Sequence, residues 1–370
     1  MYKNNFYNKK KVMITGNTGF KGTWLSLFLK TLGADVIGYA DKIPYKKAIL
    51  SRKSFNKLFK QYWEDIRDHR SLDKVYKIEK PDMIFHLAAQ PLVLESYLKP
   101  KETFETNVLG TLNILNILKN ASDKIPLVII TTDKVYLNKE NKTPFLEQDT
   151  LMGDCPYSMS KVCAELLTKS YFEIERNMRI STVRAGNVIG GGDWAKDRII
   201  PDILKSIIDK KLLQIRNPHS TRPWIHILDV CYGYALVAEK LYNAKPVLLN
   251  YNLAPSYREN YSVKDLMKEI FREFNKKDLI INKVNRNKKE KKYLNLNASK
   301  AKKELKWKTN FDFYQATSET GKWYKKVING ESSLKTTEKQ IKNYLLNLKI
   351  NFDYLDKQII KESNYADHIQ

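Results

Sequence analysis

The chain has 370 residues, with 65 Lys and Arg against 41 Asp and Glu, which gives a formal net charge of +24. Hydrophobic residues make up 42% of the sequence, which excludes a disordered chain and suits one large α/β unit or two fused units. The three cysteines are too few for a disulfide framework, and no C-x-x-C pair is present. No signal peptide is evident, and no apolar run approaches the ~20 residues of a membrane-spanning helix, so we expect a cytoplasmic protein.

The basic excess consists mostly of lysines that are scattered among many asparagines, without an arginine-rich motif. This pattern favours a solvated basic surface over a binding stripe, so we expect no specific nucleic-acid partner and no membrane partner. A basic enzyme would still attract phosphorylated substrates.

Apolar runs of strand length alternate with helical patterns through the first half of the chain. The expected strands cover residues 11–15, 35–39, 62–63, 82–88, 127–131 and 180–184, and the expected helices cover residues 24–32, 103–118 and 157–175. The strands are apolar without alternation, which is typical of a parallel sheet covered by helices on both faces. The pattern predicts an α/β fold with a Rossmann, doubly wound parallel sheet.

The second half is less regular. Its expected helices cover residues 199–210, 228–241 and 262–275, and Ser262 is the expected N-cap of the third. Apolar residues return over residues 311–327. Residues 276–310 are dense in Lys and Asn.

A glycine-rich segment, TGNTGFKG at residues 15–22, lies between the first expected strand and the first expected helix. Gly16 permits a tight turn, Gly19 lets the backbone approach a pyrophosphate, and Gly22 permits close packing of helix on strand. Asn17 and Phe20 belong to the same loop. Its place in the first βαβ unit predicts a dinucleotide-binding site.

An acidic residue follows at the end of the second expected strand, where Asp41 stands 25 residues after Gly16. A carboxylate accepts hydrogen bonds from both ribose hydroxyls and repels a 2′-phosphate, which favours NAD over NADP. Two neighbouring lysines weaken this preference. Asp65 and Ile66 follow the next strand, where an acidic and an apolar residue suit contact with adenine.

Tyr157 and Lys161 are four residues apart, so they share one face of the expected helix. An ammonium group, together with the positive charge of an oxidised nicotinamide, lowers the pKa of a nearby tyrosine. The phenolate then takes a proton from a sugar hydroxyl while hydride leaves the carbon. The pair follows TTDK at residues 131–134, in a chain that already has a phosphate loop, and this combination indicates a dehydrogenase-type site.

The strings TGNTGFKG, HLAAQ (86–90), TTDK, YSMSK (157–161) and RAGNVIGG (184–191), in that order, resemble the extended short-chain dehydrogenase/reductase family. More narrowly, YWEDIRD (62–68), TFETNVLGT (103–111) and TRPWIHILD (221–229) are similar to CDP-glucose 4,6-dehydratases. The resemblance implies an NAD-dependent hydro-lyase that converts CDP-glucose to CDP-4-keto-6-deoxyglucose. It also implies a role in deoxysugar synthesis for surface polysaccharide such as O-antigen.

The resemblance further implies a redox-neutral mechanism. Tyr157, aided by Lys161, removes the proton of the 4-hydroxyl, and hydride passes from C4 to NAD⁺. Lys134 takes the C5 proton where other dehydratases carry Glu, Asp133 protonates the departing 6-hydroxyl, and hydride returns to C6. Thr132 is expected to hydrogen-bond near the 4-oxygen. The alternative role for Lys134 is a charge partner that tunes Asp133.

The resemblance also implies which groups surround the two ligands. Besides the loop residues, Tyr157 and Lys161, those expected at NAD are Ala88, Ala89, Gln90 and Asn107. Those expected at the nucleotide sugar are Ser96, Tyr97, Asn187, Arg198 and Arg222, and the arginines suit bidentate contact with phosphate. His86 and His226 lie in apolar strings and are expected to be structural, and we expect no metal site.

We expect residues 1–190 to form the NAD-binding domain, with residues 220–250 returning to it. Residues 191–330 are expected to form mainly a smaller, mixed α/β nucleotide-sugar lobe, and residues 331–370 a polar helix and tail. Members of the family commonly form dimers, so the helices at 103–118 and 157–175 are candidates for a homodimer or homotetramer interface.

Two residues depart from the pattern of CDP-glucose dehydratases, which usually have His in place of Asn17 and Arg in place of Leu94. A related dehydratase or epimerase acting on another nucleotide hexose therefore stays open, although a 4-epimerase has no use for Asp133. A third alternative is a non-enzymatic dinucleotide-binding protein that contacts nucleic acid through its charge. The presence of both Tyr157 and Lys161 opposes it.

Overall fold

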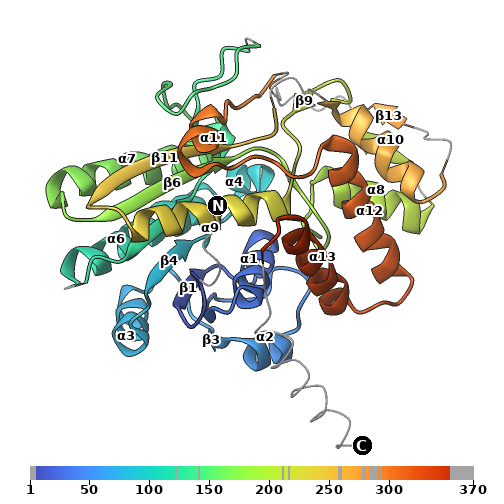
Figure 1. Ribbon diagram of the computed structural model, residues 1–370. Helices are drawn as coiled ribbons and strands as arrows, with labels where there is room; N and C mark the ends of the chain where they lie inside the picture. Colours follow the sequence, from blue (N-terminus) through green and yellow to red (C-terminus); the bar gives the residue numbers. More distant parts are fainter. Residues whose placement is uncertain are drawn as a thin grey trace, which may run out of the picture.

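The computed structural model describes residues 6–121, 123–140, 142–210, 212–215, 217–256, 261–276, 281–283, 291 and 293–350. Its main feature is a seven-stranded sheet with helices on both sides, and a smaller group of helices lies beside it (Figure 1). The strands are β1 (Lys11–Thr15), β2 (Asp35–Tyr39), β3 (Lys60–Tyr62), β4 (Met83–His86), β5 (Pro126–Ile130), β6 (Arg179–Ala185) and β11 (Val247–Leu253). All pairs are parallel and the order is β11-β6-β5-β4-β1-β2-β3, so the predicted Rossmann fold is confirmed.

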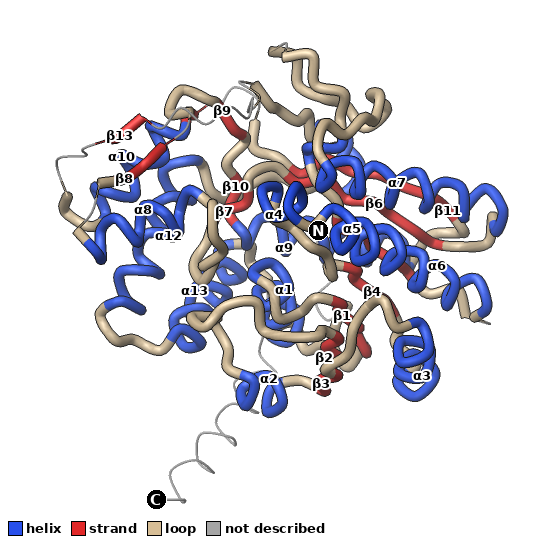
Figure 2. The backbone as a smooth tube through the Cα atoms, turned by 180° about the vertical axis from the view of Figure 1, so that it is seen from behind, coloured by secondary structure: helices blue, strands red, loops and turns tan. Residues whose placement is uncertain are grey.

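Alternate side chains of the strands enter two separate cores, because successive residues of a strand point to opposite faces. Val12 and Ile14 lie in the core that contains α1 (Phe20–Thr31) and α9 (Ile227–Tyr242). Met13 lies in the other core, with α3 (His69–Glu79), α6 (Gly110–Asn120) and α7 (Pro156–Glu175). Figure 2 shows α6 and α7 beside β6 and β11. Burial on both faces explains why the strands are apolar throughout.

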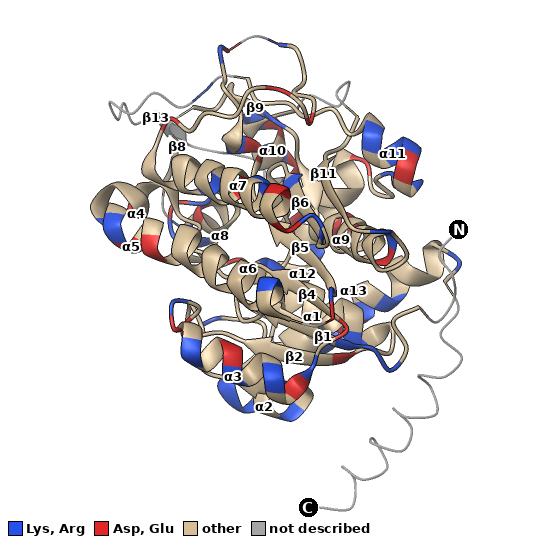
Figure 3. Ribbon diagram, turned by 90° about the vertical axis from the view of Figure 1, so that its left-hand side faces the viewer, with Lys and Arg blue, Asp and Glu red and all other residues tan. Residues whose placement is uncertain are grey.

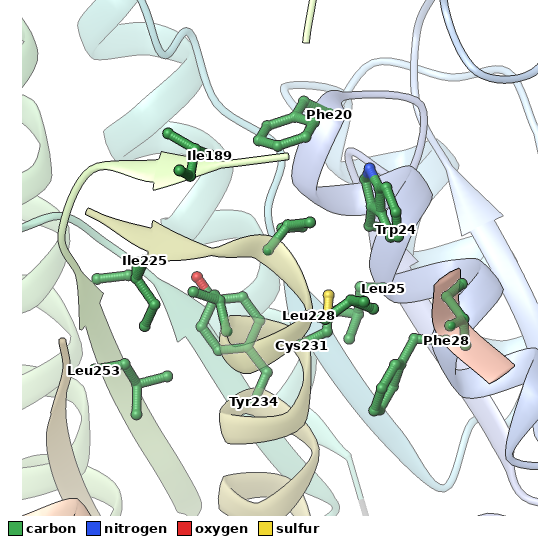
Figure 4. Packing of buried hydrophobic residues seen from close by; sticks show 14 of the residues in the cluster. Phe20, Trp24, Leu25, Phe28, Ile189, Ile225, Leu228, Cys231, Tyr234 and Leu253 are labelled. Atoms are coloured by element: carbon green, nitrogen blue, oxygen red, sulfur yellow. The ribbon is translucent and has the colours of Figure 1, made fainter. Parts of the chain in front are cut away.

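The first face is closed by α1 and α9. Figure 4 shows Trp24, Leu25 and Phe28 of α1 beside α9, which contributes Cys231 and Tyr234. All five side chains are fully buried, and burial of each apolar side chain stabilises the fold by roughly 1.5–3 kcal/mol. This core holds the N-terminus of α1 and the glycine-rich loop before it against the sheet.

The helix expected over residues 103–118 is divided, and this expectation was wrong in detail. The chain forms α5 (Pro100–Phe104), a π-helical turn (Glu105–Leu109) and then α6. A π-helical turn adds a residue to one turn of helix and changes the direction of the side chains around it. Here it buries the amide of Asn107, which bonds to Gln90 and Ser160.

The last strand of the sheet, β11, was not predicted. Its sequence, VLLNYNL, contains two asparagines, which are depleted in strands, and its first four residues are only half-buried. The strand pairs with β6 at the edge of the sheet, so α9 and β11 both return the chain to the seven-stranded sheet.

A smaller group of elements follows β6. Its helices are α8 (Ile199–Asp209), α10 (Val263–Glu273) and α12 (Phe313–Ile328). Two-stranded sheets pair β7 (Val188–Ile189) with β10 (Ile225–His226), β8 (Leu213–Ile215) with β13 (Ile281–Lys283), and β9 (Thr221–Arg222) with β12 (Tyr261–Ser262). Ser262 caps α10 as predicted, because its hydroxyl accepts a hydrogen bond from the Asp265 N–H. The shorter helices of the chain are α2 (Arg52–Leu58), α4 (Val93–Leu98) and α11 (Ser299–Leu305).

The C-terminal helix α13 (Ser333–Asn347) is polar on one face only. Ile341 and Tyr344 are buried, and the Tyr344 hydroxyl donates to Asp229 Oδ1 of α9 at 2.7 Å. The helix therefore packs on the cofactor-binding half, beside α1 (Figure 1). The expected tail after residue 350 lies outside the described residues. No described helix is long and apolar enough to cross a membrane.

Basic and acidic residues both occur along helices on the side shown in Figure 3, for example in α3 and α11. Several form pairs along one helix, such as Lys77 with Asp73 at 2.6 Å and Lys99 with Glu95 at 3.0 Å. Exposed pairs of this kind stabilise a helix by only about 0.3–0.5 kcal/mol.

Candidate functional site

The candidate site lies where the strand order changes direction, between β1 and β4. In open parallel sheets, ligands bind in the crevice outside the carboxyl ends of the strands at such a point. The loops after these two strands touch: a Cβ atom on Gly16 would lie 2.6 Å from the backbone nitrogen of Ala88. The Ala88 N–H also donates to the Thr15 hydroxyl at 3.3 Å. The fold thus joins the TGNTGFKG and HLAAQ segments.

The glycine-rich loop has the geometry of a phosphate cradle. Gly16 has a φ of +69°, and a Cβ atom on Gly22 would lie under 3.0 Å from Gly16 backbone atoms, so α1 packs directly on the loop. A Cβ atom on Gly19 would meet only the Gly16 carbonyl oxygen, at 3.5 Å. The N-terminus of α1 has no side-chain cap and no acidic residue in its first turn. Its backbone N–H groups and helix dipole suit an anion, so these residues fit the pyrophosphate of a dinucleotide.

Asn17 has a different place from the one expected. Its side chain is fully buried, and its Nδ2 donates to Gln61 Oε1 at 2.7 Å. Gln61 Nε2 donates back to Asn17 Oδ1 at 3.3 Å. Gly38 leaves room for this amide pair, since a Cβ atom there would overlap both side chains. The Asn17 side chain thus supports the loop from below, and the expectation that it lies beside the pyrophosphate is corrected.

The loops after β2 and β3 carry the residues that are expected at the adenosine. Asp41 follows β2 and is exposed, with Lys42 Nζ at 3.2 Å from its carboxylate. Asp65 follows β3, and Arg67 binds both of its oxygens, which holds the pKa of Asp65 below its ordinary value. The Ile66 side chain is buried against Gly110 of α6. The expected ribose and adenine residues therefore lie at one end of the crevice.

Asn107 organises the loop after β4. Its Oδ1 accepts from the Gln90 N–H at 2.8 Å, and its Nδ2 donates to Ser160 Oγ at 2.8 Å. Asn107 is 1% exposed, so its side chain positions the loop rather than presenting a group to the crevice. Ala88, Ala89 and Gln90 are half-buried along that loop, beside the helix that carries Lys161.

The expected catalytic residues meet at the end of β5 and the start of α7. The Thr132 hydroxyl donates to Asp133 Oδ1 at 3.1 Å and accepts from the Lys134 N–H at 3.3 Å. It also lies beside Tyr157, whose pKa it acts to lower. Asp133 is 3% exposed, and its Oδ2 has no hydrogen-bond partner in the described part of the chain. Lys161 lies one helical turn after Tyr157 and donates from Nζ to the Ile130 carbonyl at 3.1 Å.

The two titrating residues of α7 have strongly perturbed pKa values. Burial raises the pKa of Tyr157 to about 12, although the Thr132 hydrogen bond and the Arg198 charge act in the opposite direction. Burial lowers the pKa of Lys161 to about 8, and the charge of Lys21 lowers it further. The protein side chains alone therefore do not lower the pKa of Tyr157. The expected lowering includes the charge of the nicotinamide and stays a prediction.

A buried ion pair that the sequence analysis missed fixes this part of the site. Glu165, one turn after Lys161, accepts from Arg184 Nε at 2.7 Å and Nη2 at 2.5 Å. It also accepts from the hydroxyls of Thr131 at 2.6 Å and Thr182 at 3.0 Å. The pair ties α7 to β5 and β6. The signal was Arg184 inside an otherwise apolar strand, RISTVRA, which predicts a buried partner.

Lys21 is the second residue that the sequence analysis missed. It is half-buried in the first turn of α1, and its charge interacts with Asp133, Lys161 and Arg198. Burial, followed by Arg198, lowers the pKa of Lys21 to about 8. It forms no hydrogen bond or ion pair with a described residue. A lysine inside the glycine-rich loop was the available signal. Lys134, by comparison, is half-buried in a 3-10 turn.

The expected substrate residues Arg198, Arg222 and Asn187 have different surroundings. Arg198 pairs with Asp193 at 3.4 Å, and its charge acts on Tyr157 and Lys21, so it lies at the catalytic site. Arg222 is buried on β9, and its Nη1 donates to the Thr221 carbonyl at 2.7 Å. Asn187 is half-buried between β6 and β7.

Ser96 and Tyr97 belong to α4 and differ in exposure. Ser96 is fully buried, and its hydroxyl donates to the Val93 carbonyl of the same helix at 2.7 Å. This hydroxyl serves the helix, and the expected contact of Ser96 with the sugar stays a prediction. Tyr97 is 44% exposed beside Asp154 and Cys155, at the start of α7.

Both buried histidines have structural surroundings, as expected. His86 bonds to the Thr15 and Thr111 hydroxyls, and burial lowers its pKa to about 3. His226 packs edge-on to Trp24 and Phe311, and burial also lowers its pKa to about 3. Within the described ranges, no group of three His, Cys, Asp or Glu side chains is placed to hold a metal ion.

Comparison with known proteins agrees with this geometry. Residues 13–320 match the family described as GDP-mannose 4,6 dehydratase, and the chain belongs to this family of nucleotide-sugar dehydratases. The chain is 37% identical over 355 residues to the CDP-glucose 4,6-dehydratase of Salmonella typhimurium, which covers 93% of this chain and 99% of that protein. The expected membership among the extended short-chain sugar dehydratases, which are hydro-lyases, is confirmed.

Solved structures share the fold. A dTDP-glucose 4,6-dehydratase from Bacillus anthracis in complex with NAD has a TM-score of 0.74 at 23% identity, covering 89% of this chain and 99% of that one. A UDP-glucose 4-epimerase from Bifidobacterium longum in complex with NAD⁺ and UDP has a TM-score of 0.76 at 23% identity, covering 87% and 100%. NAD is thus the cofactor bound in related structures, and the loop at Gly16–Gly22 fits it.

Proposed function

We propose that the chain dehydrates CDP-glucose to CDP-4-keto-6-deoxyglucose with NAD, as a step in making deoxysugars for surface polysaccharide such as O-antigen. The observation that carries the proposal is Asp133, a buried carboxyl that is hydrogen-bonded to Thr132 and has one unpartnered oxygen beside Tyr157. Elimination of the 6-hydroxyl needs an acid at such a place, whereas a 4-epimerase expels nothing. Similarity along nearly the whole of the Salmonella CDP-glucose 4,6-dehydratase supports the choice of nucleotide.

Four residues each have a separate role in the proposed reaction. When bound, NAD would accept hydride from C4 of the sugar and return it to C6. Tyr157 takes the proton of the 4-hydroxyl, and Thr132 orients that oxygen through its hydroxyl. Lys161 supplies positive charge one helical turn away, which stabilises the phenolate. Asp133 gives its proton to the departing 6-hydroxyl, which leaves as water.

The base at C5 has two candidates. We propose Lys134, which follows the acid directly and stands where other dehydratases carry a Glu. Lys21 is the second candidate, because a lysine must lose its proton before it acts as a base and burial lowers the pKa of Lys21 to about 8. Exchange of the C5 hydrogen with deuterated water decides between them: the variant that loses exchange but keeps C4 oxidation, Lys134→Met or Lys21→Met, identifies the base. Loss of exchange in neither variant would contradict both assignments.

The nucleotide diphosphate is proposed to lie between the catalytic residues and the smaller group of helices. Arg198 and Arg222 are the proposed phosphate ligands, because a planar guanidinium binds phosphate through two parallel hydrogen bonds. Asn187 and Tyr97 are the proposed contacts nearer the sugar. Arg198 links this region to the catalytic site, since its charge acts on Tyr157.

The proposed assembly is a homodimer or homotetramer in the cytoplasm. Leu166 and Ile174 of α7 are 53% and 67% exposed, and Leu109 beside α6 is 48% exposed. Apolar side chains on neighbouring helices suit a helical subunit interface. Sedimentation of the protein would test this, and a monomer at micromolar concentration would contradict it.

The role of Asp133 is tested by Asp133→Asn. The variant should still bind NAD and oxidise C4, but its loss of water should slow by about 100-fold or more, the usual contribution of a general acid. Asp154→Asn, at an exposed carboxylate just before α7, is the matched control and should keep the wild-type rate. Unchanged water loss in Asp133→Asn would contradict the proposed role.

A further inference from the structure

The proposed dehydration, on which this inference rests, leaves two residues in the wrong protonation state after each turnover. Tyr157 begins as the phenolate and ends as the phenol, because it has taken the 4-hydroxyl proton. Asp133 begins protonated and ends as the carboxylate, because its proton left with the 6-hydroxyl as water. The C5 base returns its proton to C5, and the hydride that left C4 returns to C6. Before the next turnover, Tyr157 must therefore lose one proton and Asp133 must gain one.

The hydroxyl of Thr132 lies between these two residues. It donates to Asp133 Oδ1 at 3.1 Å and lies beside Tyr157, whose pKa it acts to lower. It also accepts from the backbone N–H of Lys134 at 3.3 Å. A hydroxyl has one proton to donate and two lone pairs to accept with. Thr132 uses its proton to donate to Asp133. One lone pair accepts from the Lys134 N–H, and the other is available to accept from Tyr157 once that residue is a phenol.

Bulk water has little access to this path. Tyr157 is 8% exposed, Thr132 is 7% exposed and Asp133 is 3% exposed. The neighbouring threonine, Thr131, does not offer a second path, because its hydroxyl donates to Glu165 at 2.6 Å. The two ends of the proton transfer are thus joined by a single buried hydroxyl among the described side chains.

We propose that Thr132 relays a proton from Tyr157 to Asp133 and so resets the active site between turnovers. The Tyr157 O–H bond breaks as its proton moves to Thr132 Oγ1, and the Thr132 proton moves to Asp133 Oδ1. Thr132 ends as it began, Tyr157 regains the phenolate, and Asp133 regains its proton. Rotation of the carboxyl about its Cβ–Cγ bond, a broad torsion, then exchanges Oδ1 with the unpartnered Oδ2.

The direction of transfer follows the cofactor charge. Without the cofactor, burial as the largest cause raises the pKa of Tyr157 to about 12, which favours the phenol. A positively charged nicotinamide, which is present again after hydride returns to C6, favours the phenolate and the release of the proton. Resetting is therefore coupled to completion of the previous turnover.

The test compares Thr132→Val, which keeps the shape but lacks the hydroxyl, with Thr132→Ser, which keeps the hydroxyl. Each protein is equilibrated with NAD, mixed with excess CDP-glucose and quenched at intervals. The relay predicts that Thr132→Val forms one product per active site in a burst, followed by a steady phase slower by about 10-fold or more. Thr132→Ser and the wild type should show no such burst. Deuterated water should slow the steady phase of Thr132→Val more than its burst.

Three results would overturn the relay. A burst in all three proteins would mark slow product release, and equal slowing of both phases in Thr132→Val would mark a purely positioning role for the hydroxyl. Wild-type steady turnover in Thr132→Val would show that the hydroxyl is not needed for resetting. Absence of dehydration by the wild-type protein would instead refute the proposed function, so the two failures are distinguishable.

Discussion

The buried ion pair of Glu165 and Arg184 gives the sharpest prediction about the framework of the site. Both side chains are almost fully buried, at 4% and 2% exposure, and their closest atoms are 2.5 Å apart. Glu165→Gln keeps the shape of the side chain but leaves the Arg184 guanidinium buried without an anion. Removing one partner of a buried pair costs about 3–5 kcal/mol, because the remaining charge stays desolvated.

The assay is equilibrium unfolding of the cofactor-free protein in urea. With an m value of roughly 3 kcal/mol/M, the unfolding midpoint of Glu165→Gln should fall by about 1 M or more. The control is Glu173→Gln on the same helix, where an exposed pair with Arg176 is expected to contribute under about 1 kcal/mol. A double variant, Glu165→Leu with Arg184→Met, should recover most of the loss, since it leaves no buried charge. A Glu165→Gln midpoint equal to that of Glu173→Gln would refute this reasoning.

Two further predictions concern the cofactor loop and the buried lysine. Gly22→Ala should weaken NAD binding by about 10-fold or more, because the new Cβ would press on the Gly16 backbone and move the loop by tenths of an ångström. Equilibrium dialysis measures the Kd for NAD, and an unchanged Kd would contradict this prediction. Lys161 has a pKa lowered from 10.5 to about 8, so below pH 8 it is charged in both the folded and the unfolded state and its burial penalty is fully present. Between about pH 8 and 10.5 the folded state loses this proton first, and the penalty is relieved. Lys161→Met should therefore stabilise the cofactor-free protein by on the order of 3 kcal/mol at pH 7. This gain in unfolding free energy should vanish by about pH 10.5. A gain that does not change with pH would count against a charge effect.

Features encoded within a few neighbouring residues were predicted well. The strands β1, β2 and β5 are short apolar runs, and the loop at Gly16–Gly22 follows a strand and precedes a helix, so local sequence was enough. The helix that carries Tyr157 and Lys161 was also predicted within one residue of its observed bounds. Their shared face followed from helical geometry alone.

Features that depend on distant partners were not predicted. Asn17 pairs with Gln61, 44 positions away, and no local pattern indicates that their amides meet. Glu165 and Arg184 likewise lie on a helix and a strand that become neighbours only in the fold. The π-helical turn around Asn107 depends on the contacts of that amide with two other segments. In each case tertiary packing sets the role of a residue whose own sequence neighbourhood carries no signal for it.

The most direct test of the account is incubation of the purified protein with NAD and, separately, CDP-, dTDP-, GDP- and UDP-hexoses, with the mass of each product recorded. We expect that CDP-glucose alone loses one water, without net formation of NADH. Water loss from another nucleotide hexose would keep the mechanism and contradict the assigned nucleotide. No water loss from any of them, or oxidation that leaves NADH behind, would contradict the central claim that Asp133, Thr132 and Tyr157 form a dehydration site.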